Sequence, residues 1–293
     1  MNPTLNADLH CHSVVSDGTL TPEELALRAK TQGVGLWALT DHDEIGGQAR
    51  AAAAAAACGL DYLTGVEISV TFLHQTVHIV GLGFDASNVQ LAQGLQKTRG
   101  GRSQRAQEMA DDLARVGIKG AFEGALKYAD NPNLISRTHF ARFLVETGVC
   151  KDTYEVFRKY LTEGKPGYVA HRWASLKDAV GWITEAGGMA VIAHPARYKF
   201  SANEELALFT EFKGHGGRGM EVVTGSHSVA ESVSYAHSAL EFKLAASRGS
   251  DFHSPEESRT ELGSLPMLPG ELTPVWTLLE DRIQRAPQGR QHP

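Results

Sequence analysis

The sequence predicts an α/β protein with a parallel sheet, open or closed as a barrel, and helices outside it. The chain has 293 residues, near the upper end of what one α/β barrel domain usually occupies. Strand and helix patterns alternate through about the first ninety residues and resume after residue 167. Between these parts the pattern is helical throughout. We therefore expect a barrel built from residues 1–99 and 168–293, with an all-helical insertion domain at residues 100–167.

The first strand and helix are predicted from local patterns. Residues 5–12 alternate with period two, which places Asp8, His10 and His12 on one face of a strand. A helix should then begin at Thr21, because Thr21 and Glu24 form a capping box around a proline in the first helical turn. This helix should end near residue 33.

The later elements follow the same reasoning. Residues 35–39, 60–70 and 77–83 are predicted strands, and the alanine-rich residues 49–57 are a predicted helix. After the insertion, we expect a helix at 176–186 and strands at 189–193, 220–224 and 244–246. Repeated units of this kind favour a parallel sheet.

Composition excludes several classes of protein. The net charge of −6 argues against stable binding to duplex nucleic acid, and no apolar run is long enough to predict a membrane span. Residues 1–6 lack the features of a secretory signal. Cys11, Cys58 and Cys150 cannot all pair with one another and show no CxxC spacing, so we expect a reducing, cytoplasmic setting.

The strongest local motif is His10-Cys11-His12. Two residues apart on a strand, both imidazoles lie on the same face and can reach one metal ion. Asp8 shares that face and could orient a ligand, whereas Cys11 should point away into the barrel wall. On its own, the pair is equally compatible with two solvated histidines at a strand end.

Similar side chains recur near the ends of the other predicted strands. In a parallel α/β fold these ends meet at one rim, which is where such folds place functional groups. Glu67 falls in an otherwise apolar strand, where an unpaired charge is costly without a cation or a partner. Any one of the histidines could be a core residue, but the recurrence predicts a metal site. The residues are His10, His12, Asp17, His42, Glu67, His78, His194, Asp251 and His253.

Together, these motifs resemble the PHP (polymerase and histidinol phosphatase) family. The matching segments are Asp8-Leu9-His10-Cys11-His12-Ser13, Asp17-Gly18, Thr40-Asp41-His42-Asp43, Gly65-Val66-Glu67, His78, Ala193-His194-Pro195 and Gly249-Ser250-Asp251-Phe252-His253. The resemblance implies a distorted (β/α)7 barrel with two or three divalent ions on its C-terminal rim.

The resemblance also implies a set of ligands for each ion. His10, His12, Glu67 and Asp251 would hold one ion. Asp17, His42 and His253 would hold a second, and Glu67, His78 and His194 a third. Several relatives have histidine at position 17, and the aspartate here favours Mn²⁺, Fe²⁺ or Mg²⁺ over Zn²⁺, with Mn²⁺ our first choice.

The expected mechanism is hydrolysis by a hydroxide that bridges the metal ions. Asp17, His42, Glu67 and Asp251 would act in catalysis by holding those ions. A serine or cysteine nucleophile is not required.

The helical insertion predicts where the substrate binds. Two short segments place basic or polar side chains at expected helix starts, a favourable arrangement for binding an anion, although each arginine could equally be a solvated helix residue. Lys165 and Tyr168 could add a cation and a stacking ring. The predicted binding residues are Arg102, Ser103, Arg105, Ser136, Arg137 and His139.

This layout resembles the stand-alone PHP subgroup of nucleoside 3′,5′-bisphosphate phosphatases and 5′-to-3′ exoribonucleases. The resemblance implies that the metals cleave the 3′-phosphoryl ester while the insertion holds the 5′-phosphate, so the expected partner is a nucleoside bisphosphate or a short single-stranded oligoribonucleotide. The alternatives are a histidinol-phosphatase-like enzyme, a catalytically silent metal-binding module and an amidohydrolase-like C–N hydrolase. The oligomeric state stays open.

Overall fold

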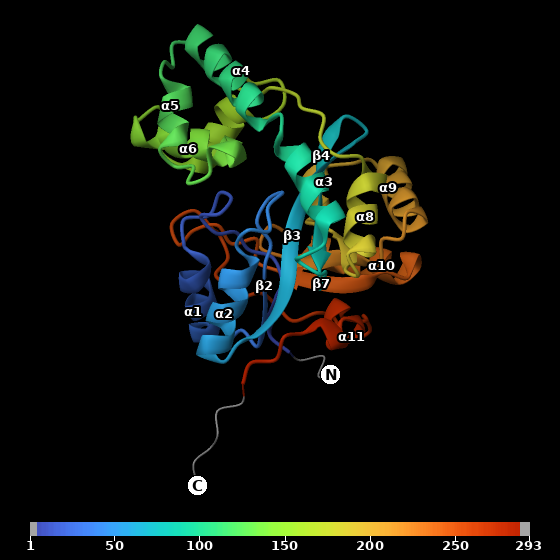
Figure 1. The fold of residues 1–293 in the computed structure, drawn as a ribbon. Helices are drawn as coiled ribbons and strands as arrows, with labels where there is room; N and C mark the ends of the chain where they lie inside the picture. The colour runs from blue at the N-terminus through green and yellow to red at the C-terminus, as the bar shows by residue number, and fades with distance from the viewer. Residues whose placement is uncertain (1–4, 288–293) are drawn as a thin grey trace.

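The computed structural model describes residues 5–287, which form a seven-stranded sheet curled towards a barrel (Figure 1). The sheet nearly closes where the first and last strands meet, because the Leu9 N–H donates to the Arg248 carbonyl and the His12 N–H donates to the Phe252 carbonyl. This confirms the predicted α/β barrel. The strands, in spatial order, are β1 (Ala7–Asp8), β2 (Leu36–Leu39), β3 (Asp61–Phe72), β4 (Gln75–Leu82), β5 (Met189–Ile192), β6 (Gly219–Thr224) and β7 (Ala245–Gly249).

The expectation of a wholly parallel sheet is wrong for β4, which runs antiparallel to both of its neighbours. Leu73 and His74 connect β3 to β4 as a two-residue turn, with φ of 45° and 68°. A parallel crossover needs about a dozen residues, so this short connection can only make a hairpin. As a result β4 starts at the rim where β3 and β5 end, and its early residue His78 lies opposite Ser69 of β3.

Helices cover the outside of the sheet. In Figure 1, α1 and α2 lie on one side of the molecule, and α8, α9 and α10 lie on the other. Helix α1 has the predicted capping box, with the Thr21 side chain accepting from the Glu24 N–H. Within residues 5–287 no helix combines the length and apolar character needed to cross a membrane. The outer helices are α1 (Pro22–Thr31), α2 (Gln48–Cys58), α3 (Val89–Arg99), α8 (Leu176–Glu185), α9 (Ala202–Gly214) and α10 (Val229–Phe242). Helix α11 (Val275–Leu278) lies at one end of the barrel and packs into its core through Val275 and Trp276 (Figure 1).

A separate group of helices lies beyond one end of the barrel (Figure 1). It comprises α4 (Arg102–Arg115), α5 (Ala121–Leu126), α6 (Arg137–Glu146) and α7 (Thr153–Val156), and it ends in a π-helical turn at Phe157–Leu161. These helices pack around a hydrophobic cluster of their own that includes Leu113, Phe140 and Leu144. The domain boundaries at residues 99/100 and 167/168 stay a prediction. Two parts of these expectations lie outside the described residues. They are residues 1–4, within the segment expected to lack a secretory signal, and residues 288–293, at the end of the expected barrel part.

Candidate metal centre

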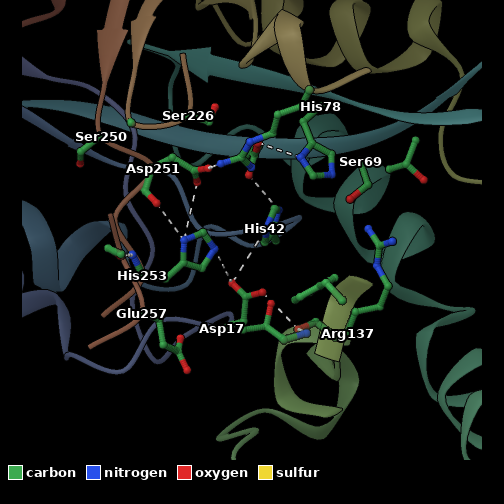
Figure 2. A pocket seen from close by; sticks show the side chains of 18 of the residues that line it. Asp17, His42, Ser69, His78, Arg137, Ser226, Ser250, Asp251, His253 and Glu257 are labelled. Atoms are coloured by element: carbon green, nitrogen blue, oxygen red, sulfur yellow. Dashed lines mark hydrogen bonds and ion pairs between the residues drawn. The ribbon is translucent and has the colours of Figure 1, made fainter. Parts of the chain in front are cut away.

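The predicted ligands converge at the barrel rim from several strands and the loops that follow them. His10 and His12 follow β1, and His42 follows β2. Glu67 lies within β3, and its side chain is fully buried. Asp251 and His253 follow β7 and share one space with Asp17, His42 and His78 (Figure 2).

The first predicted ligand set forms a tight, buried group. Ligand atoms of His10, His12, Glu67 and Asp251 all lie within 4.8 Å of one another. The His10 Nε2–Glu67 Oε1 distance is 3.3 Å and the His12 Nε2–Asp251 Oδ1 distance is 3.2 Å. Two ligands about 2.1 Å from one ion, and at right angles, lie about 3.0 Å apart. These spacings suit ligands that share an ion.

The second predicted set also comes together. Asp17, His42 and His253 form a group of the same size, and His12 joins it. Of the three imidazoles in this group, His253 comes nearest to the Asp17 carboxylate, with its Nε2 3.5 Å from Asp17 Oδ1.

The third set is looser than expected, because the compact group around Glu67 contains His42 and His78 without His194. His194 still contacts this group, with its Nε2 3.0 Å from Glu67 Oε1. The Glu67 carboxylate therefore touches five imidazoles, those of His10, His12, His42, His78 and His194.

Many buried polar atoms at this rim have no hydrogen-bond partner among the described residues. A buried polar atom without a partner is costly, so each needs a ligand. The atoms are ring nitrogens and carboxylate oxygens, the donors that bind divalent metal ions in proteins. They are His10 Nε2, both ring nitrogens of His12, Asp17 Oδ1, His42 Nδ1, Glu67 Oε2, His78 Nδ1 and His194 Nδ1. The cluster therefore fits divalent cations.

The protonation states of the candidate ligands differ. Burial alone would lower the pKa of His10 and His12, but the neighbouring carboxylates raise it, that of His12 to about 10, so these two rings would release a proton on binding a metal ion. Burial would raise the pKa of Glu67, but the surrounding imidazoles, His78 first, hold it well below its ordinary value. Burial lowers the pKa of His194 to about 3 and that of His253 to about 4. These rings are therefore neutral at physiological pH, as a metal ligand must be.

Glu221 of β6 orients one of the histidines. Its Oε1 lies 2.9 Å from His10 Nδ1, which leaves His10 Nε2 facing Glu67 and Asp251. Its Oε2 accepts from the His194 N–H at 2.7 Å. A carboxylate that fixes the far nitrogen of a ligating imidazole is a recurrent feature of metal sites.

The neighbouring residues differ from expectation in one respect. Asp8 does not contact a candidate ligand side chain; its carboxylate accepts from the N–H groups of Ser250 and Gly263 and so fixes the backbone before Asp251. Cys11 points away from the histidines, as predicted, and its sulfur accepts from the Trp37 indole N–H.

The backbone at the rim is strained beside the cluster. His194 and Asp251 have φ of 26° and 55°. Left-handed backbone is uncommon for residues other than glycine, and such residues cluster at functional sites. Arg197, three residues after His194, pairs with the second oxygen of Asp251.

A cavity of about 430 Å³ extends from the cluster to the helical group. Near the cluster it is lined by Asp17, His42, Glu67, His78, Asp251 and His253. Of the six predicted substrate residues, four line the same cavity: Arg102, Arg105, Ser136 and Arg137. Ser103 and Lys165 are exposed and lie outside the lining, and the half-buried Tyr168 lies outside it as well. His139 is buried beneath the start of α6, where its Nδ1 accepts from the Ser136 N–H.

The three predicted arginines among the lining residues differ in how their charge is balanced. Arg102 forms an ion pair with Asp43. Arg105 and Arg137, by contrast, donate only to the backbone carbonyls of Val169 and Leu161 among the described residues. Burial lowers the pKa of Arg137, and burial with the neighbouring Arg137 and Arg102 charges lowers the pKa of Arg105 to about 9. This wall of the cavity carries positive charge that an anion would neutralise.

Three of these functional residues escaped the sequence reasoning. Glu221 could have been found, because it interrupts a predicted apolar strand just as Glu67 does. Asp43 was named only as part of a motif, and nothing indicated its pairing with Arg102, which lies 59 positions along the chain. Arg197 belongs to no motif or regular residue spacing from which its contact with Asp251 could have been predicted.

We expect Glu221→Gln to weaken metal binding by roughly 10–100-fold, because the neutral amide has one oxygen and cannot accept from both His10 Nδ1 and the His194 N–H, as the two carboxylate oxygens do. Equilibrium titration with Mn²⁺ measures this. Glu205→Gln is the matched control, since Glu205 accepts a hydrogen bond from Tyr235 away from the cluster. Equal metal affinity in both variants and the unaltered protein would contradict a role for Glu221.

Comparison with known proteins gives one consistent group. The profile of the PHP domain family matches residues 8–161. The chain is 53% identical over 280 residues to the 3′,5′-nucleoside bisphosphate phosphatase of Chromobacterium violaceum, covering 96% of this chain and 98% of that protein. It is 41% identical over 275 residues to the 5′-3′ exoribonuclease Rnm of Escherichia coli, covering 93% of each.

Solved structures agree. An amidohydrolase from Chromobacterium violaceum, with bound sulfate and no metal, matches with a TM-score of 0.94 and 52% identity over 98% of this chain and 100% of that one. A protein from Bifidobacterium adolescentis described as a metal-dependent phosphoesterase matches with a TM-score of 0.78 and 27% identity over 94% of each chain.

Proposed function

The chain belongs to the PHP domain family and is a hydrolase, and we propose that it removes the 3′-phosphate from nucleoside 3′,5′-bisphosphates. The same site would release 5′-mononucleotides from short oligoribonucleotides, because both reactions cleave a 3′-linked phosphoryl ester. Two relatives support the pair of reactions by name, one a bisphosphate phosphatase and the other a 5′-3′ exoribonuclease.

One observation carries the choice of substrate: a single cavity joins the metal-ligand cluster to the buried Arg105 and the half-buried Arg137, which have no carboxylate hydrogen-bond partner among residues 5–287. A substrate with two phosphates at different positions can meet both. We assign the 3′-phosphate to the cluster and the 5′-phosphate to Arg105 and Arg137, with Arg102 beside them.

Aromatic rings hold these arginines in place. The Arg102 guanidinium lies over the Trp173 ring at 4.7 Å from its centre, and Arg105 lies over the same ring at 5.4 Å. Arg137 lies over Phe157. Stacking on a ring face leaves the in-plane N–H groups free, and a guanidinium can then offer two of them to one phosphate.

The cluster would bind two or three divalent ions through the nine residues named above, and Mn²⁺ is our proposed metal because Asp17 adds an oxygen ligand. Bound divalent cations supply hydroxide at neutral pH and neutralise charge on the phosphoryl oxygens. Asp17, His42, Glu67 and Asp251 hold that centre. Arg197 lines the cavity beside Asp251, where its remaining N–H groups can contact the 3′-phosphate.

A substrate panel tests the proposal. Protein loaded with Mn²⁺ should release phosphate from adenosine 3′,5′-bisphosphate with a kcat/KM at least about 10-fold above that for 3′-AMP, since one charge-assisted contact contributes about 1.5–3 kcal/mol. The same panel includes 5′-AMP and histidinol phosphate. Chelation of the metal should abolish release, and Mn²⁺ should restore it.

Two results would count against the proposal. A preference for histidinol phosphate would exclude the nucleotide assignment while leaving the barrel and its metals in place. Equal rates for 3′-AMP and the bisphosphate would exclude a separate pocket for the 5′-phosphate.

A further inference from the structure

Asp17 occupies a loop between β1 and α1, so neither strand nor helix hydrogen bonds fix its backbone. The loop packs closely on the barrel, because a Cβ on the following Gly18 would lie 2.2 Å from the His12 carbonyl oxygen. Asp17 Oδ1 faces the imidazoles of His12, His42 and His253, at 4.0, 3.9 and 3.5 Å. Other contacts must therefore hold the second carboxylate oxygen and the backbone of Asp17.

Helix α6 supplies that support. Ser136, the N-cap of α6, donates from its hydroxyl to Asp17 Oδ2 at 3.1 Å. Arg142 Nη2 donates to the Asp17 backbone carbonyl at 2.8 Å. His139 lies between them in sequence, and residues three positions apart share one helix face. One face of α6 therefore lies against Asp17, while Arg137 beside Ser136 lines the cavity (Figure 2).

Arg142 also contacts the loop that carries His253, which belongs to the same ligand set as Asp17. Its Nε and Nη2 donate to the two oxygens of Glu257 at 2.9 and 2.8 Å. Glu257 is four residues beyond His253, and the intervening turn is fixed because the His253 N–H donates to the Ser258 hydroxyl at 2.8 Å. A buried guanidinium, only 7% exposed, thus joins the loops that carry Asp17 and His253.

We propose that Arg142 is a positioning residue for the metal ion held by Asp17, His42 and His253, and that α6 couples this ion to binding of the 5′-phosphate. Only the second part of this inference, the coupling to the 5′-phosphate, rests on the proposed function. Arg137 begins the helix whose face holds Asp17, so an anion bound at Arg137 restrains α6 and, with it, the Asp17 carboxylate. Coupling between two sites is reciprocal, so a nucleoside 5′-phosphate should tighten metal binding.

The first test is Arg142→Gln, with Arg142→Lys as a milder variant that keeps the charge and loses the paired contact with Glu257. The control is Arg28→Gln, because Arg28 makes the same two-pronged contact with Glu261 away from the cavity. We expect Mn²⁺ titration to show one class of ion bound roughly 10–100-fold more weakly in Arg142→Gln and unchanged in Arg28→Gln. Unchanged metal binding in both Arg142 variants, or equal losses in Arg28→Gln, would overturn the positioning role.

The second test measures Mn²⁺ affinity with and without 5′-AMP. In the unaltered protein 5′-AMP should tighten binding of that ion by about 5-fold or more, and in Arg142→Gln this gain should disappear. No change on adding 5′-AMP to the unaltered protein would overturn the coupling. If the protein hydrolyses none of the proposed substrates, the metal titrations still decide the role of Arg142. A failure of the proposed function can therefore be distinguished from a failure of the positioning role.

Kinetics give a third readout. Arg142→Gln should lower kcat for the 3′,5′-bisphosphate more than it raises KM, because it disturbs the metal ligand and leaves the arginines of the phosphate pocket in place. A rise in KM alone would instead make Arg142 part of that pocket and would contradict the proposal.

Discussion

Glu67→Gln is expected to lower kcat by on the order of 10³-fold or more, since removing even an outer partner of a metal ligand costs roughly 10–100-fold. Glu67 is the carboxylate on which the cluster converges, and it contacts five histidines. The amide keeps the size of the side chain but offers only one oxygen and no charge. Steady-state phosphate release under saturating Mn²⁺ measures the loss.

Thermal unfolding distinguishes a lost site from a lost fold. Metal binding stabilises the folded state by RT ln(1 + [M]/Kd), where [M] is the free metal concentration, so Mn²⁺ should raise the Tm of the unaltered protein. We expect Glu67→Gln to fold without metal and to gain much less from added Mn²⁺. Retention of the full metal-dependent rise in Tm together with full activity would show that Glu67 is not a ligand.

The sequence predicted the barrel and the convergence of its rim residues because both follow from short-range patterns. A two-residue period predicted that His10 and His12 project to the same side of the chain, which they do just after β1, and any α/β barrel brings its strand ends together. The reversal of β4 was missed, although the short connection at Leu73 and His74 contained the signal. That reversal is what brings His78 to the rim.

Pairings between distant segments could not be predicted in the same way. Arg102 was expected to serve the substrate alone, and the structure pairs it with Asp43. The contact of Arg142 with Asp17 spans 125 positions and depends on how α6 sits against the barrel. Single-sequence patterns carry no information about such packing, because many partners are compatible with one buried arginine.

Arg137→Ala is expected to raise KM for adenosine 3′,5′-bisphosphate by roughly 10–100-fold, since a hydrogen bond to a charged group contributes about 1.5–3 kcal/mol. Arg137 is the first residue of α6, and its guanidinium lies over Phe157. Among residues 5–287 the Arg137 guanidinium donates to a neutral carbonyl, that of Leu161. Its charge therefore remains available for a phosphate. Initial rates over a range of substrate concentrations measure the change.

The comparison substrate decides what this result means. A simple aryl phosphate has one phosphoryl group, which the metal centre takes, so its KM should be nearly the same in Arg137→Ala and in the unaltered protein. Arg115→Ala is the matched control, because Arg115 lies at the exposed end of α4 and pairs with Asp112. Equal increases in KM for both substrates would mean that Arg137 acts at the metal centre or on folding, and the 5′-phosphate pocket would then have to be placed elsewhere.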